Sequence, residues 1–266
     1  MTTSEFGKGL ALFSAVSNPV PAVLDRLGLR HAPYILRLRS GVAIELRPQV
    51  GDLFGFYEIM LRKDYLASGQ RLDLGATVID VGANIGCFTV LAASIVGPTG
   101  RVFAIEPEES TYRQLLRNIS LNRLTNVTPL RLAVGASRGM ITLHTDRNRL
   151  FSSVFSSVNG REVGGTEQQV QMTTLVELMN AHQIPHCAYL KLDCEGAEHE
   201  IIGNMALTTA WRISQITMEV HKVPGFDGQT LKDRLESLGY RRIGTSTLPF
   251  YAQALENRDP DQKRVG

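Results

Sequence analysis

The residues with the clearest potential for chemistry are polar side chains that stand where short apolar runs end. Glu106 closes one such run, Asp193 closes a second, and Glu219 and His221 stand at the end of a third. Runs of this kind predict buried strands. In an open α/β sheet, ligands bind outside the carboxyl ends of the strands. We therefore expect these three acids and the histidine to meet at one edge of a sheet.

A turn of small residues follows a fourth apolar run. Residues 77–81 predict a buried strand that is interrupted by Asp80, and Gly82, Asn84 and Gly86 form the turn. A helix-compatible stretch comes next, followed by another strand that ends on an acid. The order strand, glycine-rich turn, helix, strand and acid is that of the half-unit that binds adenosine-bearing cofactors in doubly wound α/β folds.

The spacing within the turn distinguishes between such cofactors. The turn lacks the G-x-G-x-x-G pattern that lets backbone approach a pyrophosphate, and it lacks the lysine of a Walker loop. This disfavours a nicotinamide oxidoreductase and favours a cofactor without phosphate, such as S-adenosylmethionine. An acid beside the turn suits the positive charges of that molecule, and a later carboxylate can accept from its ribose hydroxyls. The alternative is a structural crossover with a tight turn and no cofactor. The residues expected to bind the cofactor are Asp80, Gly82, Asn84, Gly86 and Glu106.

Four motifs together carry a resemblance to a known family. They are Asp80-Val-Gly-Ala-Asn-Ile-Gly86, Ile105-Glu-Pro107, Thr174-Leu-Val-Glu-Leu178 and Leu190-Lys-Leu-Asp-Cys-Glu-Gly-Ala-Glu198. With them the sequence resembles the FkbM family of S-adenosylmethionine-dependent methyltransferases, over roughly residues 45–222. The first two motifs are general to class I methyltransferases, and the last block is the family-specific one. Cys194 departs from it, because the family more often has an aliphatic residue there.

The resemblance implies O-methylation of a small molecule, with acceptors such as sugar hydroxyls or polyketide and peptide natural products. Two alternatives stay open at this point: an N-methyltransferase of a small molecule, and a cofactor-binding protein without catalysis. No N-P-P-Y-type tetrapeptide follows the apolar run 188–192, which argues against an amide or base-amine acceptor. The residues do not indicate which acceptor is used, nor the oligomeric state.

Transfer of a methyl group to a hydroxyl needs a base, or a metal that lowers the pKa of the hydroxyl. In one version, Asp193 or His221 takes the proton directly. In the other, Asp193, Glu219 and His221 hold a divalent cation, where oxygen ligands favour Mg²⁺ and the added imidazole favours Mn²⁺. Glu195 is a third catalytic candidate, although it could instead cap the helix that is predicted to begin near Gly196. His221 could likewise be a purely structural residue.

The predicted fold is an α/β, Rossmann-like, doubly wound sheet of seven strands, as in class I methyltransferases, with an N-terminal extension and a small β-insertion. The expected parts are an extension with a hairpin and a helix (1–70), the cofactor-binding core (71–256), an insertion within it (139–172) and a tail (257–266). Within the insertion, residues 151–165 are rich in Ser and Gly and carry two Phe. We expect this piece to be a mobile element over the acceptor site.

The expected elements follow from periodicity and punctuation. The predicted core strands are 77–81, 101–105, 127–132, 188–192, 213–220, 240–244 and 250–255, and the predicted helices are 54–66, 86–96, 109–122, 173–181, 197–208 and 229–238. A hairpin is expected at 34–46, and an antiparallel pair at 140–144 and 168–172. Ser110 and Asn122 are expected to cap the ends of their helix.

Composition excludes several other classes of protein. The chain has 266 residues, of which 28 are basic and 26 acidic, so a net charge of +2 gives no broad basic field and no nucleic-acid substrate is expected. The three cysteines have no C-x-x-C spacing, which indicates reduced thiols in a cytoplasmic protein. The uncharged stretch 9–24 is broken by Pro19 and Pro21, so we expect a docked N-terminal element and no membrane span.

Overall fold

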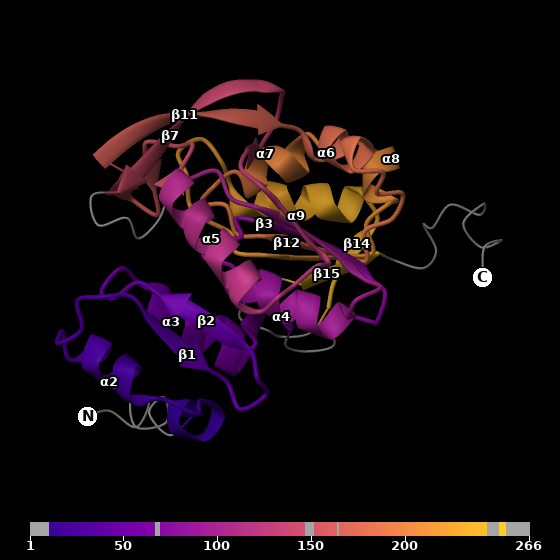
Figure 1. Ribbon diagram of the computed structural model, residues 1–266. Coiled ribbons are helices and arrows are strands. Elements are labelled where there is room, and N and C mark those ends of the chain that lie inside the picture. Colours follow the sequence, from indigo (N-terminus) through magenta and orange to yellow (C-terminus); the bar gives the residue numbers. More distant parts are fainter. Residues whose placement is uncertain (1–10, 67–69, 147–151, 164, 244–249, 254–266) are drawn as a thin grey trace.

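The computed structural model describes residues 11–66, 70–146, 152–163, 165–243 and 250–253 (Figure 1). Its centre is a seven-stranded sheet, and its strands from one edge to the other are β14 (Tyr240–Arg242), β15 (Phe250–Gln253), β13 (Gln215–Met218), β12 (Tyr189–Leu192), β3 (Thr77–Val81), β4 (Arg101–Ile105) and β5 (Val127–Leu130). The strands from β13 to β5 are parallel, while β15 runs antiparallel to both of its neighbours. The predicted doubly wound fold with seven strands is confirmed.

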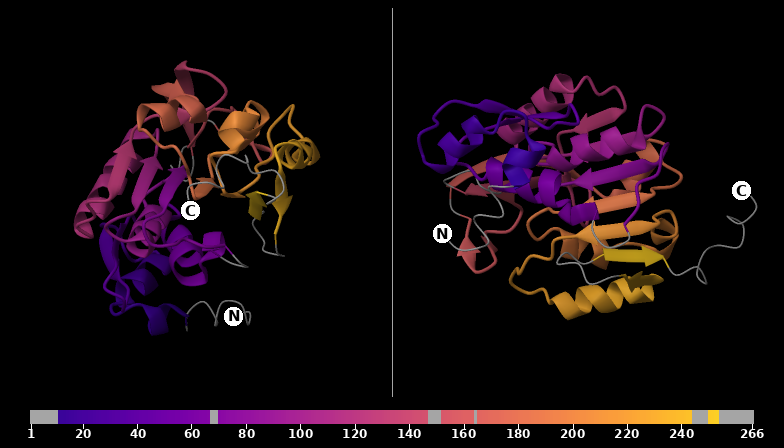
Figure 2. Two further views of the ribbon diagram at one scale, coloured as in Figure 1. Left: turned by 90° about the vertical axis from the view of Figure 1, so that its right-hand side faces the viewer. Right: turned by 90° about the horizontal axis from the view of Figure 1, so that it is seen from below.

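Helices cover both faces of this sheet (Figure 2). The helices of the core are α4 (Cys87–Val96), α5 (Glu109–Leu121), α6 (Leu175–Ala181), α7 (Glu198–Gly203), α8 (Leu207–Ala210) and α9 (Gly228–Ser237). On one face Val78 and Tyr189 pack against α4. On the other face Ile79, Leu190 and Leu192 pack against α6, α7 and α9. Because both faces are buried, the central strands are continuous apolar runs in the sequence.

Two predicted helix boundaries are wrong. The helix expected over 197–208 is two short helices, α7 and α8, because Asn204 ends the first and its side-chain amide donates to the Glu200 carbonyl (2.9 Å). The N-cap of α5 is Glu108 and not Ser110, since the Glu108 carboxylate accepts from the Thr111 N–H (2.7 Å). Ser110 donates its hydroxyl to the same carboxylate. The predicted cap at the other end, Asn122, is confirmed.

The N-terminal extension contributes a hairpin and a chain of helical turns. Its elements are α2 (Val20–Arg26), β1 (Tyr34–Arg37), β2 (Ala43–Leu46), α3 (Asp52–Phe56), a π-helix (Tyr57–Arg62) and a 3₁₀-helix (Asp64–Leu66). The hairpin β1–β2 is found where it was predicted. The helix predicted over 54–66 is wrong in its bounds and type: α3 continues directly into the π-helix, and Lys63, whose backbone is left-handed (φ 58°), separates both from the 3₁₀-helix. Apolar side chains of the extension share a core cluster with α4, and the hairpin lies beside α5 (Figure 1).

The insertion is a second, smaller sheet. Its strands are β6 (Ala133–Val134), β11 (Gly165–Thr173), β7 (Gly139–Asp146) and β8 (Ser152–Ser153), in that order. The predicted antiparallel pair is confirmed as β7 with β11. The division of the chain at residues 70 and 256 stays a prediction, and the predicted tail 257–266 lies outside the described residues.

Two further properties bear on where the protein works. All three cysteines are free, with Cys87 and Cys187 buried and Cys194 partly exposed. Among the described residues, no helix combines the length and the apolar character needed to cross a membrane.

Candidate active site

The turn after β3 is drawn tightly against the neighbouring strand ends. Gly82 has a left-handed backbone (φ 75°), and a Cβ atom there would lie 1.7 Å from the Asp193 carbonyl oxygen. The N–H groups of Gly82 and Ala83 both donate to the Ile105 carbonyl at the end of β4 (3.0 and 2.9 Å). Only glycine permits this approach. The turn is thereby held between the carboxyl ends of β4 and β12.

Glu106 is joined to this turn by backbone hydrogen bonds. Its carboxylate accepts from the N–H of Asn84 and from the N–H of Glu108, each at 2.9 Å. The side chain is buried, and burial raises the pKa of Glu106 to about 7 although the two backbone bonds act against it. Each carboxylate oxygen has a second lone pair, so Glu106 can still accept hydrogen bonds from a ligand.

Asp80 lies behind the turn and not on its surface. It is fully buried, and its carboxylate accepts from the Thr89 hydroxyl (2.6 Å) and pairs with the Lys191 ammonium (3.1 Å). Lys191 also donates to the Gly82 carbonyl (2.7 Å). Burial lowers the pKa of Lys191, but Asp80 and Asp193 outweigh it and raise this pKa above the ordinary value. Lys191 is therefore a buried cation that ties Asp80 to the turn from within the sheet.

Asp193 lies at the end of β12, as predicted, and is partly exposed. Its Oδ2 atom accepts from the Tyr65 hydroxyl (2.8 Å) and lies 3.5 Å from the Lys191 ammonium. Burial raises the pKa of Tyr65 well above its usual value, so this hydroxyl stays a donor. Tyr65 comes from the extension and was not among the predicted site residues. No signal in the sequence links it to Asp193, because the contact joins two distant segments.

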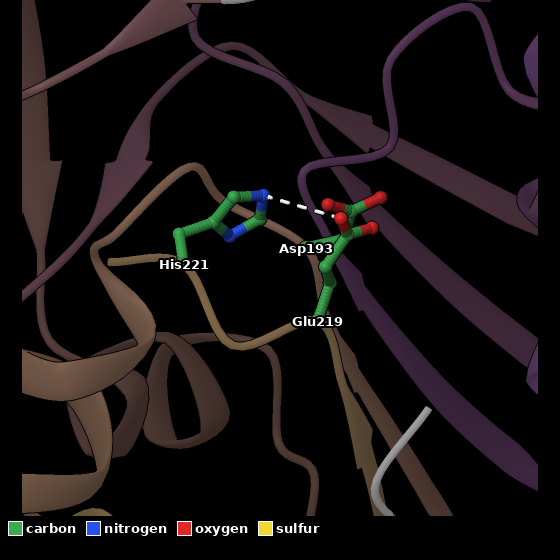
Figure 3. A group of neighbouring side chains, drawn as sticks. All are labelled: Asp193, Glu219 and His221. Carbon is green, nitrogen blue, oxygen red and sulfur yellow. Dashed lines mark ion pairs between the residues drawn. The ribbon is translucent and has the colours of Figure 1, made fainter. Parts of the chain in front are cut away.

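His221 is buried among carboxylates, and Figure 3 shows two of them, those of Asp193 and Glu219, on one side of its ring. Its Nδ1 lies 3.0 Å from Glu198 Oε1, and its backbone N–H donates to the same oxygen (2.7 Å). Its Nε2 lies 3.2 Å from Glu195 and 3.7 Å from Glu219. Burial lowers the pKa of His221, but the bond to Glu198 and the neighbouring acids outweigh this and raise it to about 9. Without a ligand the ring therefore carries a proton near neutral pH.

Glu195 faces His221 and does not cap α7. The N-cap of α7 is Ala197, which has no side-chain cap bond, and the N–H of Gly196 before it is taken by the Glu198 carboxylate (2.9 Å). Burial raises the pKa of Glu195 to about 7. Glu198 was not singled out from the sequence, although it closes the family-specific motif. Its spacing of three from Glu195 places both acids at one helix start, which is the signal that could have indicated it.

Two cavities meet at these residues and share Gly82, Asn84 and Asp193. The first combines three acids, Glu106, Asp193 and Glu195, with apolar side chains, and its other lining residues include Leu132, Val134, Leu143, Val154 and Cys194. The second carries charged and aromatic groups, and its other lining residues include Asp52, Glu58, Tyr65, Arg161, Lys191 and Glu219. The predicted strand-end residues are therefore brought together around a divided pocket, with the glycine turn between its halves.

Comparison with known proteins relates this geometry to a family. The family model described as the methyltransferase FkbM domain matches residues 80–242. The hexuronic acid methyltransferase AglP of Haloferax volcanii is 28% identical over 184 residues, which are 68% of this chain and 66% of that protein. The 31-O-demethyl-FK506 methyltransferase FkbM of Streptomyces tacrolimicus is 26% identical over 224 residues, covering 74% of this chain and 85% of that protein.

A solved structure gives a weaker likeness. The methyltransferase FkbM from Methylobacillus flagellatus has 13% identity and a TM-score of 0.47, covering 78% of this chain and 56% of that chain. The assignment therefore depends on the family match, which spans more than half of the chain, and on the strand order described above. The chain belongs to the FkbM methyltransferase family and is an S-adenosylmethionine-dependent methyltransferase of the class I fold.

Proposed function

We propose that this enzyme methylates a hydroxyl oxygen of a sugar or of a polyketide or peptide natural product. The observation that carries the proposal is the position of Asp193, whose carboxylate stands where the two cavities meet. One cavity can then hold the cofactor and the other the acceptor. The names of the two relatives, a hexuronic acid methyltransferase and a 31-O-demethyl-FK506 methyltransferase, support an oxygen acceptor of this kind.

The first cavity suits the nucleoside part of S-adenosylmethionine. Its apolar lining can pack against a flat base, while Glu106 can accept from both ribose hydroxyls. Gly82 and Asn84 line this cavity and let the backbone approach the cofactor. Gly86 lines neither cavity and instead begins α4 against Leu115. We assign Asp80 an indirect role, because its carboxylate is occupied by Lys191 and Thr89 and it supports the turn from behind.

The cofactor supplies an activated methyl group on a sulfonium. In the reaction a C–O bond forms to the acceptor while the C–S bond breaks, and the bonding electron pair stays on sulfur. The hydroxyl proton must leave, so the protein has to accept it or direct it to solvent. The main task of the chain is to align the two reacting atoms, since the donor is already reactive.

Asp193 is our leading candidate for the group that orients the acceptor hydroxyl and receives its proton. Tyr65 and Lys191 occupy its Oδ2 atom, which fixes the direction of the carboxylate. His221 is a weaker base candidate than the sequence indicated, because its ring is protonated in the ligand-free arrangement. Glu195 is the second base candidate, since its pKa of about 7 matches the pH at which it would act.

The proposal is tested by offering the protein S-adenosylmethionine with a deuterated methyl group and a panel of hydroxylated acceptors. The panel contains hexuronic acids, neutral sugars and macrolides, with amine-bearing analogues beside them. We expect one labelled methyl group on an oxygen, located by fragmentation in a mass spectrometer, and none in samples without protein. A methyl group found on nitrogen would contradict O-methylation. Absence of transfer to every acceptor would favour the non-catalytic alternative.

The remaining expectations concern the surroundings of the enzyme. We propose a small molecule as the acceptor and not a nucleic acid, because the net charge of +2 provides no broad basic field. We also propose a cytoplasmic location, which the free cysteines support.

A further inference from the structure

One ligand atom from each of Asp193, Glu219 and His221 lies within 4.8 Å of the others. Asp193 and Glu219 directly follow the adjacent parallel strands β12 and β13, and His221, two residues further on, is held by Glu198. Figure 3 shows the His221 ring directed at the two carboxylates. We propose that these three side chains bind a divalent cation, Mn²⁺ or Mg²⁺, on the acceptor side of the active site.

The imidazole is oriented as a metal-binding histidine is. Glu198 is fully buried, and it holds both Nδ1 and the backbone N–H of His221. A carboxylate on one ring nitrogen fixes the tautomer and directs the other nitrogen at the metal. Here the other nitrogen, Nε2, points at Glu195 and Glu219.

The charges around the three ligands also favour a cation. Glu195 lies next to His221, and Glu58 of the π-helix lines the same cavity as Asp193 and Glu219. Like charges this close repel one another, and Lys191, whose ammonium lies 3.5 Å from Asp193, offsets only part of this negative charge. A divalent ion at the centre of the group would relieve this repulsion. Two carboxylates with one imidazole suit Mn²⁺ somewhat better than Mg²⁺.

Three protein ligands leave open coordination positions on a divalent cation. The number of these open positions indicates which acceptors could bind there. An acceptor with two neighbouring oxygens, such as a vicinal diol or a hydroxy acid, could occupy two of them. The bound hydroxyl would have a lowered pKa and would lose its proton more easily to a neighbouring carboxylate or to solvent. This role depends on the proposed O-methylation, whereas the binding of the cation does not.

The experiment is a titration of the whole protein with Mn²⁺ in the presence of S-adenosylhomocysteine. Binding is measured as the loss of the electron paramagnetic resonance signal of free Mn²⁺. We expect one Mn²⁺ per chain. The informative variant is Glu219→Gln, because this side chain is 48% exposed and its replacement should not unfold the protein. The matched control is Glu236→Gln, a 53% exposed acid on α9 that loses the same charge. Glu219→Gln should weaken binding at least about 10-fold, and the control should match the parent.

Two outcomes would overturn the site: a parent protein that binds no Mn²⁺ at millimolar concentration, or equal Mn²⁺ affinity in both variants. The titration contains no acceptor, so its result is independent of methyl transfer. If Mn²⁺ binds but no acceptor is methylated, the proposed function fails and the site stands. If methylation proceeds in a protein that binds no Mn²⁺, the site fails and the function stands. Preference for a vicinal diol over its monohydroxy analogue tests the role of the cation.

Discussion

Glu106 is a buried acid whose ionised form costs the ligand-free folded protein stability, because its two backbone hydrogen bonds offset the effect of burial only in part. Its folded pKa of about 7 exceeds the ordinary value of 4.5. Between these two pH values the folded, ligand-free chain therefore holds a proton that the unfolded chain releases. By linkage, the contribution of this group to the free energy of unfolding is lost as the pH rises through that window.

The first prediction is that Glu106→Gln weakens the cofactor and stabilises the empty protein. At pH 8 the loss of charged acceptors should reduce affinity for S-adenosylhomocysteine by about 10-fold or more, at about 1.5–3 kcal/mol per charged hydrogen bond. The parent should bind more weakly as the pH falls below about 7, while the variant should show no such dependence. Calorimetric titration at pH 6 and 8 measures both, and thermal unfolding of the empty proteins measures stability.

A control for this prediction is Glu109→Gln, which removes an exposed acid three residues away in the chain. It should behave as the parent does in both measurements. Unchanged affinity in Glu106→Gln would remove Glu106 from the cofactor site.

The second prediction concerns Asp193. Asp193→Asn keeps the shape of the side chain and removes its charge. Whether Asp193 receives the proton or binds a cation, turnover should fall by about 10²–10⁴-fold while affinity for S-adenosylhomocysteine stays near that of the parent. Single-turnover kinetics with an accepted substrate provide the measurement, with the exposed Asp73→Asn as the control. Near-normal turnover would exclude Asp193 and leave Glu195 as the base.

Residues at strand ends could be predicted from the sequence, and their partners could not. The ends of apolar runs in the sequence correctly predicted the positions of Glu106, Asp193 and His221, because the carboxyl ends of parallel strands share one edge of the sheet. Tyr65 and Glu198 were missed because their roles depend on side-chain directions and on contacts between distant segments. The buried position of Asp80 was missed for a similar reason, since its partner Lys191 belongs to the neighbouring strand.

At the level of elements, the strands were easier to predict than the helices. Strand β3 was predicted at its observed bounds, because a strand buried on both faces is a continuous run of β-forming residues. The helical region 54–66 was predicted as one helix, since periodicity does not show the left-handed Lys63 that divides it. The π-helix before Lys63 carries Glu58 and the 3₁₀-helix after it carries Tyr65, and both side chains line the pocket.

The third prediction concerns how helix α5 holds the hairpin. Asn118 of α5 and its C-cap Asn122 lie one helical turn apart. Each side-chain amide accepts from a backbone N–H of β2 and donates to a backbone carbonyl of β2. Asn118 is fully buried, so Asn118→Ala leaves the N–H of Glu45 without its partner. We expect a loss of about 1–3 kcal/mol in the free energy of unfolding, measured by urea denaturation. The exposed Ser120→Ala on the same helix is the control, and equal stability of the two variants would contradict this role.

Across the whole molecule, the pocket is assembled from three parts of the chain. The core supplies the glycine turn and the strand ends, the extension supplies Tyr65, and the insertion supplies Leu143, Ser152 and Val154. Ser153 joins the insertion to the core, since its hydroxyl donates to the Glu195 carbonyl (2.6 Å). Family motifs could predict the first contribution, because it is local in sequence. The other two depend on how separate units pack together, and a single sequence carries no periodic signal for that.

The last prediction concerns the insertion as a cover for the acceptor. The described part of the predicted mobile element already touches the site, since Phe155 lies against Phe226 (ring centroids 5.8 Å apart) and packs close to Gly196. Arg161 is exposed in this element and also lines the second cavity, which makes it a natural site for trypsin. If the element closes over bound ligands, cleavage after Arg161 should slow when S-adenosylhomocysteine and an acceptor are added. Limited proteolysis with mass spectrometry of the fragments measures the rate of cleavage after Arg161. The variant Arg161→Gln lacks this cleavage site and so identifies the fragments that result from it. Equal cleavage rates with and without ligands would show that the insertion is a fixed wall of the pocket.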